Sequence, residues 1–119
     1  MKVIQIPISD AEYLDIMRRT EDGKFSTESD FIKAVLFPES MWSVSYSKML
    51  KRLETAPLNF PFTLSSLMRD AGWSKMDKGT RLALGRSLAK LAANNRADIV
   101  IVQKSGAGAQ YMRVSREAL

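Results

Sequence analysis

The segment that most constrains this chain is its first eight residues, which have the pattern of one strand with no partner nearby. Within MKVIQIPIS, isoleucine occupies every second position, which is the alternation of a half-buried strand. A lone strand is not stable, and no second strand is predicted before residue 38. We therefore expect it to pair with the same strand of a second molecule. The protein would then be a homodimer with dimerisation residues Ile4, Ile6 and Ile8.

A short amphipathic helix is predicted after the strand. Ser9 and Glu12 have the spacing of a capping box, in which each side chain satisfies a free amide of the first turn. Leu14 and Met17 give the helix an apolar stripe. The Asp-Gly pair at 22–23 is a turn signal, so the helix is expected to end there.

A second short helix is predicted before Pro38, which ends it. Either Ser26 or Thr27 is expected to cap its start. The side of this helix that we expect to be buried consists of Phe31, Ile32, Val35 and Leu36.

This order resembles the ribbon-helix-helix family of DNA-binding proteins, on the strand VIQIPIS, the helix DAEYLDIMRR, the turn EDGK and the helix STESDFIKAVL. The resemblance covers residues 1–38. It implies that two protomers pair their strands into an antiparallel ribbon that enters the major groove. It also implies a phosphate at the start of the second helix, where free N–H groups favour anions. The implied phosphate contacts are Ser26, Thr27 and Ser29, and the implied base readers are Val3, Gln5 and Pro7, with Lys2 nearby.

Two features of this segment depart from a DNA-reading ribbon. Of the three implied readers, Gln5 alone can make a bidentate contact to a base edge. Residues 1–38 also carry five Lys and Arg against seven Asp and Glu, a net charge of −2. A dimerisation unit that does not read bases is therefore the alternative for this segment.

The positive charge lies in the rest of the chain. Residues 39–119 carry 13 Lys and Arg against six Asp and Glu, a net charge of +7. Such asymmetry between two parts of a chain indicates an anionic partner for the basic part, most often nucleic acid.

Three helices and then a hairpin are predicted in residues 41–119. The helices are expected in the segments MWSVSYSKMLKRLETA, LSSLMRDA and KGTRLALGRSLAKLAANN, and the hairpin strands at 98–103 and 110–114. This order resembles a winged-helix domain, in which the third helix recognises DNA and the hairpin is the wing. The DNA-binding residues implied here are Lys75, Lys78, Arg81, Arg86, Lys90, Lys104 and Arg113. The whole chain is then an α+β protein with a module at 1–38 and a basic domain at 41–119.

The composition excludes several function classes. The chain has neither Cys nor His, which removes disulfides, the usual zinc sites and histidine-based catalysis. No apolar run approaches the roughly 20 residues of a membrane span, and no signal peptide is visible. We therefore expect a cytoplasmic protein that is not an enzyme and uses no metal or cofactor.

The function expected from these observations is sequence-specific binding of double-stranded DNA by a homodimer. The segment FTLSSL and the residues GWSKMDKGTRLALGR also resemble a small domain found in phage- and plasmid-type bacterial proteins. A small bacterial, phage or plasmid transcriptional regulator fits these three resemblances. The alternative is a protein-interaction module, such as an antitoxin or a phage inhibitor of its host.

Overall fold

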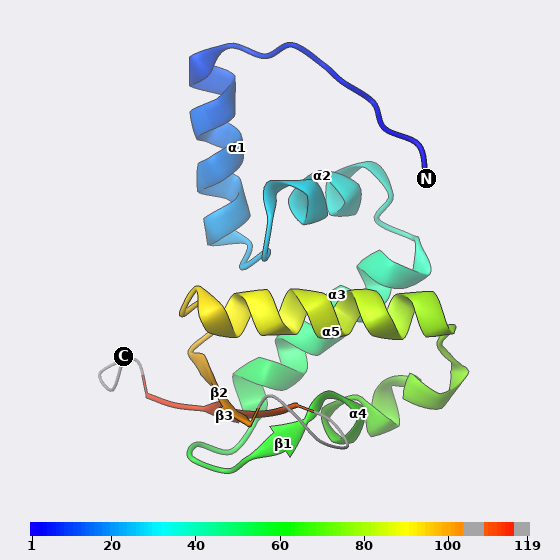
Figure 1. Cartoon of the computed structure of the whole chain (residues 1–119), viewed down its shortest axis with the longest axis vertical. Coiled ribbons are helices and arrows are strands. Elements are labelled where there is room, and N and C mark those ends of the chain that lie inside the picture. Colours follow the sequence, from blue (N-terminus) through cyan, green and yellow to red (C-terminus); the bar gives the residue numbers. More distant parts are fainter. Residues whose placement is uncertain (104–108, 116–119) are drawn as a thin grey trace.

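The computed structural model describes residues 1–103 and 109–115, in which five α-helices and a small antiparallel sheet give a mixed α+β fold (Figure 1). The helices are α1 (Asp10–Asp22), α2 (Glu28–Leu36), α3 (Met41–Thr55), α4 (Leu64–Leu67) and α5 (Lys78–Ala93). The strands are β1 (Phe62–Thr63), β2 (Ile99–Gln103) and β3 (Gln110–Arg113). Two short 3-10 helices, Arg69–Ala71 and Trp73–Lys75, connect α4 to α5.

Side-chain caps determine where the longer helices begin. The predicted capping box of α1 is confirmed: the Glu12 amide donates to Ser9 Oγ over 3.1 Å, and the Ser9 amide donates to Glu12 Oε1 over 2.9 Å. At α2 the cap is Thr27, whose hydroxyl accepts from the Asp30 amide over 3.1 Å. At α5 the cap is Asp77, which accepts from the Thr80 amide over 2.6 Å.

The hydrophobic core lies between α3, α5 and the sheet. The predicted inner stripe of α5 is confirmed, because Leu84, Leu88 and Leu91 are fully buried. They pack with Tyr46, Met49 and Leu53 of α3 and with Ile99 of β2 in one cluster. Burying a leucine of this kind stabilises the fold by about 1.5–3 kcal/mol. The side of α5 opposite these leucines is therefore directed away from the core.

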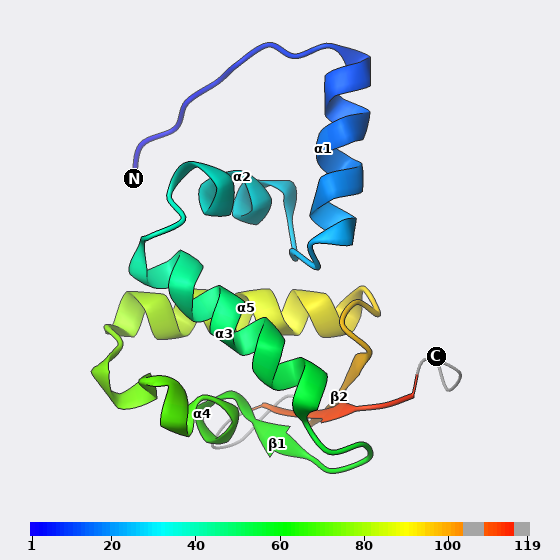
Figure 2. The same cartoon turned by 180° about the vertical axis from the view of Figure 1, so that it is seen from behind.

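The predicted hairpin is confirmed, and a third strand joins it. β3 is the central strand and pairs antiparallel with both β1 and β2. Tyr111 lies opposite Phe62 on one side and Ile101 on the other. The predicted turn at residues 106–108 lies outside the described residues. Figure 2 shows the sheet at the end of the molecule opposite α1 and α2.

Residues 1–9 carry no strand in the single chain and run as an exposed segment away from α1 (Figure 1). The helices predicted after this segment are present as α1 and α2. The predicted strand has no pairing partner among the described residues, so the strand-helix-helix arrangement stays a prediction.

The prediction that one side of α2 is buried is wrong for three of its four residues. In the single chain Ile32, Val35 and Leu36 are 40%, 60% and 64% exposed, and Phe31 is half-buried. The physical reason is that α2 contacts its neighbours through Phe31, which packs on Phe25, and through its polar first turn. Asp30 in that turn accepts a hydrogen bond from Ser87 of α5 over 3.0 Å.

The turn between α1 and α2 contacts the basic domain directly. The Tyr46 hydroxyl donates to the carbonyl of Lys24 over 2.8 Å, and the Arg96 guanidinium donates to the carbonyl of Phe25. The Phe25 ring stacks on Tyr46 with 5.2 Å between centroids. Polar and aromatic contacts therefore join residues 1–38 to the domain that follows them.

Candidate nucleic-acid interface

The outer side of α5 carries a row of exposed residues at four-residue spacing. We call Lys78, Leu82, Arg86 and Lys90 the α5 stripe. Because residues i and i+4 lie one above the other on a helix, the three cations share one face. Among the described residues none of these three cations makes an ion pair, and each is exposed. The stripe therefore presents unneutralised positive charge along a rigid helix.

The start of α5 adds a further cation. Lys75 is exposed at the end of the 3-10 helix that precedes α5. Asp77 also lies here, and its carboxylate accepts from the Thr80 amide, which holds the pKa of the Asp77 carboxyl below its usual value. This carboxylate is used as a helix cap.

Arg81 lies in α5 but donates hydrogen bonds to backbone carbonyls of its own chain. Its Nε donates to the carbonyl of Trp73 over 3.0 Å, and its Nη2 donates to the carbonyl of Ser74 over 2.9 Å. The guanidinium carbon also lies 5.4 Å from the centroid of the Trp73 ring. Arg81 therefore fastens the 3-10 helix to α5, and the structure does not place it with the stripe.

Arg113 also donates a hydrogen bond to a backbone carbonyl of its own chain. Its Nη1 donates to the carbonyl of Ala56 over 3.0 Å, which ties β3 to the end of α3. Lys104, the other cation predicted on the wing, lies outside the described residues.

The start of α2 has two different kinds of hydroxyl. Ser26 is buried and donates to the Asp30 carboxylate over 2.5 Å, so its hydroxyl faces the protein interior. Burial raises the pKa of the Tyr46 phenol, and the negative charge of the same Asp30 carboxylate raises this pKa further. Thr27 is half-buried and caps the helix, whereas Ser29 is exposed. Of the three predicted phosphate contacts, Ser29 alone has an exposed side chain.

The amino-terminal segment exposes to solvent both the residues predicted to contact DNA and the residues predicted for dimerisation. Lys2 and Gln5 are exposed. The three isoleucines predicted for dimerisation are also exposed, at 84% for Ile4, 73% for Ile6 and 46% for Ile8. Most of the surface of Ile4 and Ile6, and nearly half of that of Ile8, is therefore left in water in the single chain.

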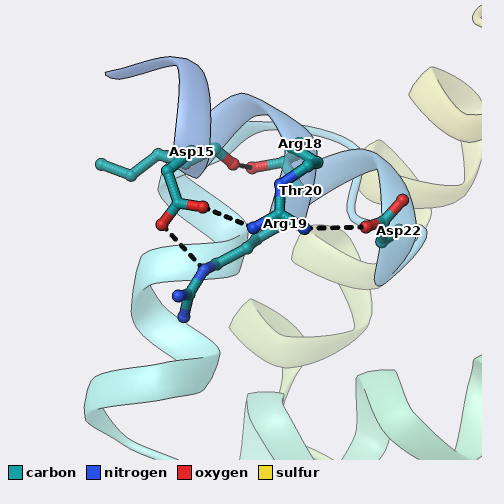
Figure 3. Close-up of polar contacts among 6 residues, drawn as sticks. Asp15, Arg18, Arg19, Thr20 and Asp22 are labelled. Carbon is teal, nitrogen blue, oxygen red and sulfur yellow. Dashed lines mark hydrogen bonds and ion pairs between the residues drawn. The ribbon is translucent and has the colours of Figure 1, made fainter. Parts of the chain in front are cut away.

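The cations of α1 are neutralised by their neighbours on the same helix (Figure 3). Asp15 pairs with Arg18 over 2.6 Å and with Arg19 over 3.0 Å, and Arg18 also lies 4.0 Å from Asp22. The Asp15 carboxyl has a lowered pKa because Arg18 donates a hydrogen bond to it. This helix surface offers little free charge to a phosphate.

Sequence reasoning did not select Lys33 of α2. It lines a pocket of about 180 Å³ together with Arg86 and Lys90. The proximity depends on how α2 packs against α5, so a local pattern around residue 33 gives no signal for it.

No described helix has the length and apolar character needed to cross a membrane. Within the described ranges, no group of three acidic side chains is arranged to hold a metal ion. Searches of protein families, curated proteins and solved structures found no match to this chain.

Proposed function

We propose that the protein is a homodimer that binds double-stranded DNA and acts as a small bacterial, phage or plasmid transcriptional regulator. The observation that carries the proposal is the α5 stripe, whose cations are exposed and have no ion-pair partner among the described residues. A row of such cations neutralises backbone phosphates and releases counterions, which supplies most of non-specific DNA affinity. The +7 charge of residues 39–119 favours the same partner.

The order of elements supports a winged-helix-like interpretation of the basic domain. Helices α3, α4 and α5 precede the β2–β3 hairpin, and α5 takes the place of the recognition helix. In this interpretation the phosphate contacts come from Lys75, Lys78, Arg86 and Lys90. Arg81 and Arg113 would keep the helix and the hairpin in position.

Unpartnered apolar surface supports the homodimer. Of the described residues, 17 large hydrophobic side chains are exposed, and 11 of them lie in residues 1–37. They include the three isoleucines of the predicted strand and three residues of α2. Exposed apolar surface that is concentrated in one segment marks an interaction site, and the ribbon resemblance makes a second copy the partner.

The same surface favours one second candidate, a protein-interaction module such as an antitoxin or a phage inhibitor. In that case a different protein would cover the apolar residues of 1–37. The two candidates differ in what residues 39–119 bind, so a DNA measurement separates them.

The test is a salt titration of binding to the duplex upstream of the protein's own gene and to a random duplex. Replacing Arg86 and Lys90 with Ala removes two cations of the α5 stripe. The slope of log K against log salt should shrink by about 0.9 for each phosphate that the variant no longer neutralises. Affinity should fall about equally for both duplexes, because phosphate contacts carry no direct sequence information.

The matched control replaces Lys48 and Lys51 with Ala, since both are exposed and lie on α3. This variant removes the same amount of charge and should keep the wild-type slope. Equal slopes in the stripe variant and the wild type would contradict the proposed surface. If the wild type binds neither duplex, the protein-interaction candidate replaces DNA binding.

A further inference from the structure

A groove runs between α2 and α5, and Arg86 and Lys90 of the α5 stripe line one end of it. It consists of a pocket of about 400 Å³ and an adjoining pocket of about 180 Å³, which share Lys33, Trp42 and Ala83 as lining residues. The larger pocket falls in the range of roughly 300–1,000 Å³ that is typical of small-ligand sites, which are often found between helices and at domain boundaries. The groove lies where residues 1–38 meet the basic domain.

Two aromatic side chains line the larger part of the groove. Phe37, which is 60% exposed, lines it, as does the half-buried Trp42. The Trp42 ring also packs against Tyr46, with 5.0 Å between the centroids and a tilt of 32°. An indole held by a buried phenol is a fixed surface on which a flat ring can stack.

The smaller part of the groove is cationic. Lys33, Arg86 and Lys90 line it, and none of them makes an ion pair within the described part of the chain. The acidic groups that face the groove are Asp30 and Asp77. Both carboxylates accept internal hydrogen bonds, Asp30 from two serine hydroxyls and Asp77 from a helix amide. Asp30 is the acidic residue among those that line the smaller part, and the three cations there outnumber it. The smaller part of the groove therefore keeps a net positive charge that attracts an anion.

We propose that this groove binds a nucleotide, with its base against Trp42 and Phe37 and its phosphate at Lys33, Arg86 and Lys90. A ligand that carries a flat ring and an anion at its two ends matches both parts of the groove. Aromatic stacking combined with cations is the way proteins hold nucleotides without reading their sequence. The nucleotide can be a free mononucleotide or one unit of a single strand. This site goes beyond the proposed binding of duplex DNA.

Tryptophan fluorescence tests the proposal. Trp42 and Trp73 are the tryptophans of the chain, so Trp73→Phe leaves Trp42 as the reporter in the groove. Adding AMP should give a saturable change of Trp42 emission. Adenosine and inorganic phosphate, which each match one part of the groove, should bind at least about tenfold more weakly, since tenfold corresponds to about 1.4 kcal/mol. A short single-stranded oligonucleotide identifies the source: it binds more tightly than AMP if the ligand is part of a strand.

Two variants test the residues by calorimetry. Lys33→Gln, an exposed position, should weaken AMP or oligonucleotide binding, whereas Lys48→Gln on α3 should leave it unchanged. Trp42→Leu should weaken binding about fivefold or more, the lower end of the range for stacking on an aromatic side chain. Trp42 packs on the buried Tyr46, so replacing it can disturb folding. If Trp42→Leu does not fold, Lys33→Gln alone tests whether the groove binds the nucleotide.

The outcomes separate this inference from the proposed function. If neither AMP nor the single strand binds at millimolar concentration, the inference is overturned. Equal affinity of Lys33→Gln and the wild type also overturns it. Duplex binding that persists in either case leaves the proposed function standing. Binding of AMP without binding of any duplex supports the groove and overturns the proposed function.

Discussion

Arg81, Arg113 and Ser26 show that the role of a polar side chain depends on where its atoms find partners. Each is of a residue type that contacts DNA in other proteins. Each also lies in a segment whose sequence resembles a DNA-binding element. The two arginines donate to backbone carbonyls of their own chain, and Ser26 donates to Asp30. A guanidinium that already donates hydrogen bonds to backbone carbonyls holds two elements together and has fewer N–H donors left for a phosphate.

Arg81→Ala should therefore act on stability. We expect it to lower the free energy of unfolding by about 1–2 kcal/mol, because it removes two charge-assisted hydrogen bonds from a half-buried side chain. Arg81→Lys should recover little, since one ammonium cannot reach two carbonyls with the geometry of a guanidinium. Urea unfolding gives the measurement. Lys78→Ala, an exposed cation on the same helix, is the control and should stay within about 0.5 kcal/mol of the wild type.

At the scale of elements, α5 has a buried leucine stripe on one side and solvent-exposed residues on the other. Gly85, Ala89 and Ala93 form a face of small residues beside the α5 stripe, a pattern that predicts close packing with another helix. The structure contradicts that prediction at Gly85, where an added Cβ would meet no atom of the described residues within 4 Å beyond its chain neighbours and its own helix backbone. The size of these residues alone did not show that the space beside Gly85 is open, because tertiary packing determines which elements lie next to a helix face.

Gly85→Ala should thus stabilise the protein. A glycine inside a helix costs about 0.5–1 kcal/mol relative to alanine, and here the new methyl group has open space. Gly72→Ala is the matched comparison, since an added Cβ there also meets nothing within 4 Å, but its φ of +89° is in the left-handed region. That variant should be destabilised by about 1–2 kcal/mol. Thermal unfolding of both variants measures the difference, and a shift of the same sign in both would contradict the argument.

At the scale of the whole molecule, the two parts of the chain differ in how much of their apolar surface they bury. The buried side chains of the core cluster come from residues 46–111, and the half-buried Phe25 packs against them. In residues 1–38 the buried side chains are Thr20 and Ser26, neither of which is hydrophobic. A segment that leaves most of its hydrophobic side chains in water would gain stability from a partner that covers them, and this is the physical basis of the proposed dimer.

Ile6→Lys tests the dimer without disturbing the single chain. Because Ile6 is 73% exposed, lysine should cost the monomer fold almost nothing but should place a charge in the predicted ribbon. Analytical ultracentrifugation at micromolar concentration should show a dimer for the wild type and a monomer for the variant. Leu82→Lys, at a 52% exposed position on α5, is the control and should remain dimeric. A wild-type monomer would contradict the proposed ribbon.

The sequence by itself determined the local structure. Caps, turn residues and periodicity depend on neighbours within about four positions, so they predict the helices, the hairpin and the inner stripe of α5. Only the tertiary structure decided how α2 packs on α5. That contact leaves Ile32, Val35 and Leu36 exposed and brings Lys33 beside Arg86. The physical reason is that such contacts join residues more than 50 positions apart, whose distance depends on how whole elements pack.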